Sequence, residues 1–93
     1  MPTEVLAKGT TEANSTDITV AAGTPINVGL FRADEKEIED HVQFPIYRKD
    51  PDGNYQPTGL TLYKYEPNVT LIGPGVYRVS RPVCTVATGI QTD

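Results

Sequence analysis

Apolar residues alternate with polar residues along most of this chain, and this is the pattern of β-strands, whose successive side chains point to opposite faces. Ile18 and Val20 share one face of a short segment, and Tyr77 and Val79 share one face of a later segment. The in-phase positions predict a core made of Ile18, Val20, Ile26, Val28, Leu30, Phe44, Ile46, Leu60, Leu62, Leu71, Val79 and Val86.

Glycine and proline separate these segments at short intervals. Residues 50–54 read Asp-Pro-Asp-Gly-Asn, in which Pro presets φ for a turn and Gly accepts a positive φ, so we expect a hairpin there. Gly73-Pro74-Gly75 predicts a second turn, followed by strands over residues 76–81 and 83–88. The chain therefore reads as one all-β domain over residues 1–93, a small β-sandwich or barrel of about seven short antiparallel strands.

Two segments depart from this pattern. Residues 33–40 carry five carboxylates around one Lys, with only Ile38 to bury, and we expect a solvated charged loop with at most one helical turn. Residues 1–15 are polar and rich in Thr, and they are expected to form a flexible arm or one that a partner orders.

Composition narrows the classes of partner. The net charge of −4 repels a phosphate backbone, so nucleic acid is not expected as a partner. No span approaches the roughly 20 apolar residues of a membrane helix, and no secretory signal is present, so we expect no membrane partner. A single cysteine fits folding in a reducing cytoplasm, and an apolar fraction of 38% predicts a thin core that self-association would supplement.

Candidate chemistry is sparse. His41 is the single histidine and Cys84 the single cysteine, and nothing in their spacing indicates a nucleophile with its base. Residues 50–54 resemble the start of a calcium loop but lack its ligand count, and a hairpin turn accounts for them. We therefore expect a protein that is not an enzyme, with no catalytic residue, no metal site and no cofactor.

Tyrosine and arginine supply the candidate interface. Tyr63 and Tyr65 would share a strand face opposite Leu60 and Leu62, as an interface or a sugar-stacking platform, unless a second sheet covers them. Arg78 and Arg81 fall on opposite faces of their strand, and an inward arginine must be paired or must reach an interface. The candidate interface residues are Tyr63, Tyr65, Tyr77, Arg78 and Arg81.

Two segments resemble small structural proteins of tailed bacteriophage virions, most of all capsid decoration (cement) proteins. They are Ile18–Phe31, which reads ITVAAGTPINVGLF, and Gly73–Pro82, which reads GPGVYRVSRP. The resemblance implies a β-domain that is made in the host bacterial cytoplasm and becomes part of the virion. It also implies attachment to the major capsid protein lattice on the head exterior, as a homo-oligomer, with a trimer favoured.

An alternative of another class stays open at this point. A small β-domain of a phage tail or baseplate could serve adhesion or glycan binding, with the tyrosine strand as its stacking platform. The two hypotheses differ in their expectations, because decoration predicts symmetric self-association, whereas adhesion predicts glycan binding by the isolated monomer.

Overall fold

The computed structural model describes residues 2–33 and 37–93, and within these it is all-β and free of helices, as the sequence predicts. The described residues form nine strands, two more than the seven expected. Their bounds are β1 Thr3–Gly9, β2 Ala13–Asn14, β3 Ile18–Val20, β4 Ile26–Arg32, β5 Phe44–Lys49, β6 Tyr55–Leu62, β7 Asn68–Leu71, β8 Gly75–Arg81 and β9 Thr88–Thr92.

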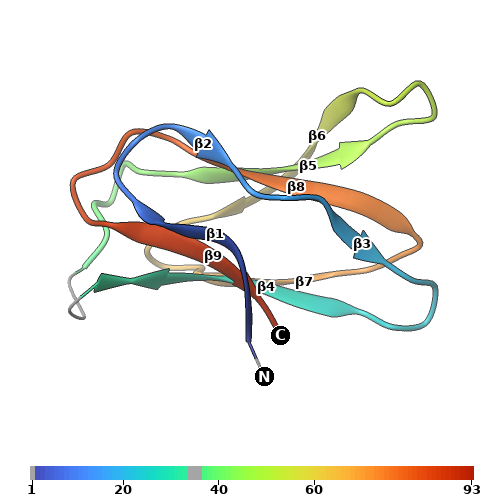
Figure 1. The fold of residues 1–93 in the computed structure, drawn as a ribbon, viewed down its shortest axis with the longest axis horizontal. Helices are drawn as coiled ribbons and strands as arrows, with labels where there is room; N and C mark the ends of the chain where they lie inside the picture. The colour runs from blue at the N-terminus through green and yellow to red at the C-terminus, as the bar shows by residue number, and fades with distance from the viewer. Residues whose placement is uncertain (1, 34–36) are drawn as a thin grey trace.

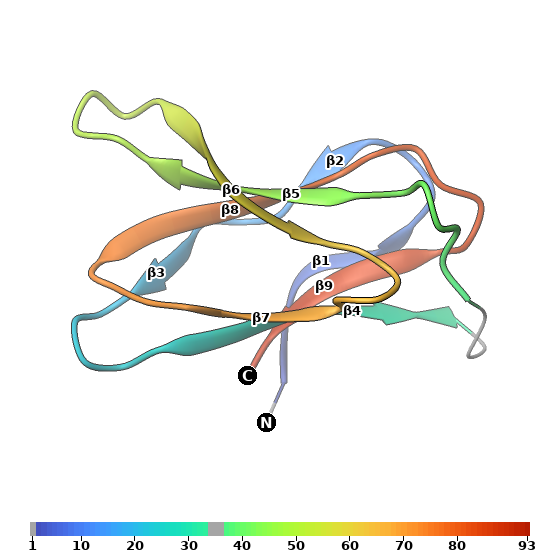
Figure 2. The same ribbon diagram turned by 180° about the vertical axis from the view of Figure 1, so that it is seen from behind.

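The strands form two antiparallel sheets that face each other as a sandwich (Figure 1). One sheet has the order β1-β9-β4-β7, and we call it the terminal sheet because it contains the first and last strands. The other has the order β2-β8-β5-β6, with β3 also paired to β8, and we call it the hairpin sheet. Seen from behind, the β5–β6 hairpin bends away from the terminal sheet (Figure 2).

The core lies between the sheets and contains most of the residues that the alternation predicts. Its buried members are Ile18, Val20, Val28, Leu30, Ile38, Val42, Phe44, Ile46, Leu62, Leu71, Tyr77, Val79, Cys84 and Ile90. Ile26 packs against this cluster while partly exposed. Two predicted core residues are not in it: Leu60 is 44% exposed, and Val86 is half-buried in a loop.

The expected N-terminal arm is instead part of the sandwich. β1 pairs with β9 along its length, and β2 pairs with β8. Val5 and Leu6, which are neighbours in the chain, both pack against the core because the register shifts between Glu4 and Leu6. This irregularity hides the period-two pattern, which is why the sequence reads as an arm.

The last strand also differs from the prediction. We expected a strand over residues 83–88, but Val83 to Ala87 form a loop and β9 begins at Thr88. Thr88 and Ile90 are fully buried, because β9 lies between β1 and β4 in the middle of the terminal sheet. Because Gly89 has no side chain, β9 shows too few alternating apolar and polar residues to be recognised as a strand in the sequence.

The charged segment at residues 33–40 lies partly outside the described residues, which omit 34–36. In the described part, Ile38 is buried in the core, although it was not among the predicted core residues. Glu37 and Asp40 are exposed, and both pair with Lys64, at 3.2 Å and 3.0 Å. This part of the segment is therefore a surface loop.

A bulge in β6 causes the hairpin to bend. Pro45 pairs with Thr61 and Tyr47 pairs with Pro57, so three residues of β6 face one residue of β5. Gly59, in the middle of these three, has φ of 84°, which an L side chain rarely adopts. The Thr58 hydroxyl donates to the Ile46 carbonyl oxygen at 2.8 Å and accepts from the Leu60 N–H at 3.1 Å. The bulge turns Leu60 out of the core.

Candidate functional site: a groove beneath the β5–β6 hairpin

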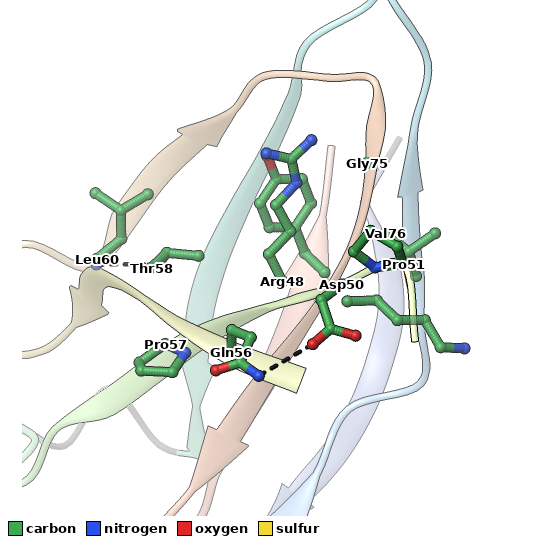
Figure 3. A pocket seen from close by; sticks show the side chains of 11 residues that line it. Arg48, Asp50, Pro51, Gln56, Pro57, Thr58, Leu60, Gly75 and Val76 are labelled. Carbon is green, nitrogen blue, oxygen red and sulfur yellow. Dashed lines mark hydrogen bonds between the residues drawn. The ribbon is translucent and has the colours of Figure 1, made fainter. Parts of the chain in front are cut away.

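A groove of about 860 Å³ lies between the extended hairpin and the start of β8 (Figure 3). One wall is the hairpin itself, with Pro57, Thr58 and Leu60 from the bulged strand. The other wall is formed by Gly75, Val76 and Tyr77 at the beginning of β8. The groove lies where the hairpin bends away from the terminal sheet (Figure 2).

The turn that closes the hairpin is held by Asp50. One carboxylate oxygen, Oδ1, accepts the backbone N–H groups of Asp52 and Asn54, both at 2.9 Å, while the other accepts from the Gln56 side-chain amide at 3.0 Å. These hydrogen bonds, the Asn54 N–H first among them, hold the pKa of Asp50 below its ordinary value. Because Asp50 is used by the turn itself, its charge is a weak candidate for ligand binding.

Two cationic residues line the groove: Lys49, which pairs with Asp17 at 3.6 Å, and Arg48. Its guanidinium donates to the Pro74 carbonyl oxygen at 2.7 Å and lies over the Tyr77 ring, 5.8 Å from the ring centre. A Cβ atom at Gly75 would come within 2.9 Å of Arg48 Nε, so the absence of a side chain at residue 75 makes room for this guanidinium. Among the described residues, no carboxylate forms an ion pair with Arg48.

The opposite face of the hairpin sheet holds a second cationic cluster. The Arg78 guanidinium stacks on the Tyr55 ring, with 3.7 Å between its central carbon and the ring centre. The Tyr55 hydroxyl donates to Asp17, which also pairs with Lys49 at 3.6 Å. The hydrogen bond to Asp17 is the main reason that the pKa of Tyr55 is raised. Within the described part of the chain, Arg78 Nε is buried without a hydrogen-bond partner.

Tyr63 and Tyr65 do not lie on a strand face. β6 ends at Leu62, and Tyr63 and Glu66 exchange backbone hydrogen bonds across a tight turn. The two rings are in edge contact, with 6.2 Å between their centres and 75° between their planes. Tyr65 is 69% exposed, with the Lys64 ammonium group 5.3 Å from its ring centre. This turn presents one open aromatic ring.

Arg81 is buried inside the sandwich, where only 4% of it is exposed. Its guanidinium donates to the carbonyl oxygens of Ala7, Thr11 and Thr88, at 2.8 to 2.9 Å. It therefore ties the N-terminal segment to β8 and β9. An inward arginine needs partners for its N–H donors, and Arg81 finds them within the chain.

The five candidate interface residues are thus spread over the molecule. Tyr77 and Arg78 face opposite sides of β8, and Tyr77 is buried, with its hydroxyl donating to the Ile72 carbonyl oxygen at 2.6 Å. Tyr63 and Tyr65 lie at the other end of the hairpin sheet, because Phe44 pairs with Leu62 there while Arg48 pairs with Tyr77 near the hairpin. Their role as an interface stays a prediction.

Sequence reasoning missed Arg48 and Leu60, which line the groove. The signal for Leu60 was Gly59, since an isolated Gly inside a strand pattern indicates a bulge. Arg48 could not be assigned from the sequence, because its partners Pro74 and Tyr77 lie more than twenty residues away in the chain.

The remaining candidates show no catalytic arrangement. Cys84 is buried, and its thiol donates to the Val86 carbonyl oxygen at 3.3 Å. Burial raises the pKa of this thiol, which keeps it protonated and a weak nucleophile. His41 is exposed on the loop that precedes β5. The described residues contain no group of three or more potential metal ligands.

None of the described segments is a helix with the length and apolar character needed to cross a membrane. Comparisons with family models, with curated proteins and with solved structures gave no match to this chain.

Proposed function

We propose that this protein is a structural binding module of a tailed bacteriophage virion that attaches to the exterior of the head and stabilises it. The observation that carries the proposal is the groove, a concave surface between the bulged hairpin and the start of β8. It is large enough to hold part of a partner protein. A module of this kind acts through contact area and needs no reacting group.

The resemblance to decoration proteins supports the choice of partner. The two similar segments contribute β3, β4 and β8, together with the turns beside β3 and β8. Strand β8 lies in the middle of the hairpin sheet, and β4 lies in the terminal sheet between β9 and β7. The resemblance therefore covers the scaffold, whereas the hairpin that forms the groove lies outside both segments.

Head stabilisation follows from linkage. A protein that binds the assembled shell, and not its dissociated subunits, shifts the equilibrium towards the shell by mass action. One that contacts two neighbouring subunits adds buried area across their boundary, so separating them costs more free energy. The groove and the opposite, cationic face of the hairpin sheet provide two surfaces for such contacts.

Co-sedimentation tests this function. The full chain is mixed with DNA-filled and emptied heads of a phage whose genome carries this sequence, after removal of any copies already bound. We expect saturable binding to the heads, and heads that release DNA at a higher temperature when the protein is bound. A chain that sediments with neither the DNA-filled nor the emptied heads would refute the proposal.

A second candidate function rests on Tyr65. Its exposed ring at the tip of the β6–β7 turn resembles the aromatic platforms on which sugars stack. A tail or baseplate domain for glycan binding would use this turn. Binding of the monomer to a glycan array, lost in Tyr65→Ala, would favour this function over head attachment.

A further inference from the structure

Most polar groups on the hairpin wall of the groove are already used inside the chain. The Thr58 hydroxyl donates to the Ile46 carbonyl oxygen and accepts from the Leu60 N–H. The Gln56 side-chain amide donates to the Asp50 carboxylate. Asp50 accepts three hydrogen bonds of its own turn. This wall therefore offers a ligand mainly the apolar surface of Pro57 and Leu60.

Arg48 is the exception. A guanidinium has five N–H donors, and within the described residues Arg48 makes one hydrogen bond, to the Pro74 carbonyl oxygen. The Tyr77 ring and the bare backbone at Gly75 hold the guanidinium in place without neutralising it. The groove thus combines apolar walls with a positioned and uncompensated cation.

We infer that this groove binds an extended segment of a partner protein that carries a carboxylate next to an apolar side chain. The carboxylate pairs with Arg48 through two N–H donors, and the apolar side chain packs against Leu60 and Pro57. Charge complementarity selects this ligand over a neutral sugar, because a sugar would leave the guanidinium without a counter-charge. The inference rests on the proposed function and names the chemistry that the head surface presents.

The same carboxylate chemistry has two sources in a partner protein, an Asp or Glu side chain and a free C-terminus. The full chain is therefore tested against an array of eight-residue peptides with one acidic residue among varied apolar residues. A matched array carries Asn or Gln in place of the acid, and a third carries the neutral sequences with a free C-terminal carboxylate. Peptides that bind are then titrated into the isotopically labelled full chain and followed by NMR.

We expect acidic peptides to bind and their amide counterparts to lose about tenfold or more in affinity, as is typical when a charge-assisted hydrogen bond is removed. Arg48→Gln should cause a similar loss, with Arg32→Gln as the matched control at an exposed arginine outside the groove. Leu60→Ser should also weaken binding, whereas Val83→Ser, at a more exposed apolar residue in the β8–β9 loop, should not. Gly75→Ala should weaken binding because its methyl group displaces Arg48.

Equal binding of the acidic and amide arrays would overturn the inference, as would unchanged peptide affinity in Arg48→Gln with the fold intact by circular dichroism. No binding to any array would overturn it as well. Failure of this inference is distinct from failure of the proposed function. If Arg48→Gln sediments with heads as well as the wild-type chain does, only the groove chemistry is refuted. If the wild-type chain binds acidic peptides but does not sediment with heads, only the proposed head attachment is refuted.

Discussion

Arg81 is the one arginine that lies inside the sandwich, and its partners explain why it is tolerated there. A buried guanidinium costs free energy unless its donors are satisfied. Three backbone carbonyl groups accept from it, and they belong to segments far apart in the chain. The side chain therefore acts as a link between the N-terminal segment, β8 and the start of β9.

Replacing Arg81 by Ala should lower the free energy of unfolding by about 2–4 kcal/mol, because it removes three charge-assisted hydrogen bonds and takes a donor from the buried Thr88 carbonyl group. Urea unfolding followed by circular dichroism measures this change. Arg32→Ala, at an exposed position, should change stability by no more than about 0.5 kcal/mol. Equal stability of the two variants would show that Arg81 is not a structural link.

The hairpin turn predicts a dependence of stability on pH. The folded-state pKa of Asp50 is lowered, so its contribution is fully present above the unfolded-state pKa near 3.8 and is lost as the pH falls through the folded-state value. Wild-type melting temperature should therefore decrease between about pH 5 and about pH 2. Asp50→Asn, which does not titrate, should show a smaller decrease, and an identical decrease in both proteins would contradict this role.

At the scale of elements, β1 is the strand whose importance is least visible in the sequence. It covers the outer edge of β9, packs Val5 and Leu6 against the core, and supplies the Ala7 carbonyl group to Arg81. Without β1, the buried strand β9 would become an edge strand with unpaired backbone groups.

Deleting residues 2–14 should therefore destabilise the domain strongly and lower its melting temperature by at least about 10 °C, since several kcal/mol are lost from a small domain. Thermal unfolding by circular dichroism gives the comparison. Leu6→Ala, which leaves the backbone pairing of β1 in place, is the milder control. A deletion variant that melts like the full chain would mean that residues 2–14 are a dispensable arm after all.

The sequence predicts the regular strands better than the irregular ones. Ile18 with Val20, and Phe44 with Ile46, are buried as their spacing requires, and the turn at residues 50–54 is where Pro and Gly place it. The errors fall where a bulge or register shift breaks the period of two, at Leu60 and in β1. The groove could not be predicted, because it forms between the β5–β6 hairpin and β8. The sequence does not indicate that β8 pairs with β5.

At the scale of the whole molecule, the accessible surface is that of an ordinary monomer. It is 5506 Å², close to the roughly 5,300 Å² typical of a monomer of this mass. A shortage of core therefore does not by itself require self-association. The exposed apolar side chains are a better reason to expect it, and they lie at both ends of the sandwich.

Ile72 follows β7 at the end near the groove, whereas Tyr65 and Val83 lie in connections that Figure 2 draws at the far end. Contacts between unlike ends of neighbouring copies close into a ring when the rotation allows it. We expect such a ring to be a trimer, with a mass of about 30 kDa for three 10.1 kDa chains. Analytical ultracentrifugation over a range of concentrations measures this, and Tyr65→Ser should favour the monomer. A single 10.1 kDa species at every concentration would refute the trimer.

The pairing of β1 with β9 brings Thr3 opposite Thr92, so the two ends of the described chain emerge side by side, from the terminal sheet (Figure 1). The groove belongs to the hairpin of the other sheet. A cargo fused at either end would thus leave the sandwich at one place and keep the groove clear, which suits the domain to surface display. A short linker between the ends should also allow a circular permutant with new termini elsewhere.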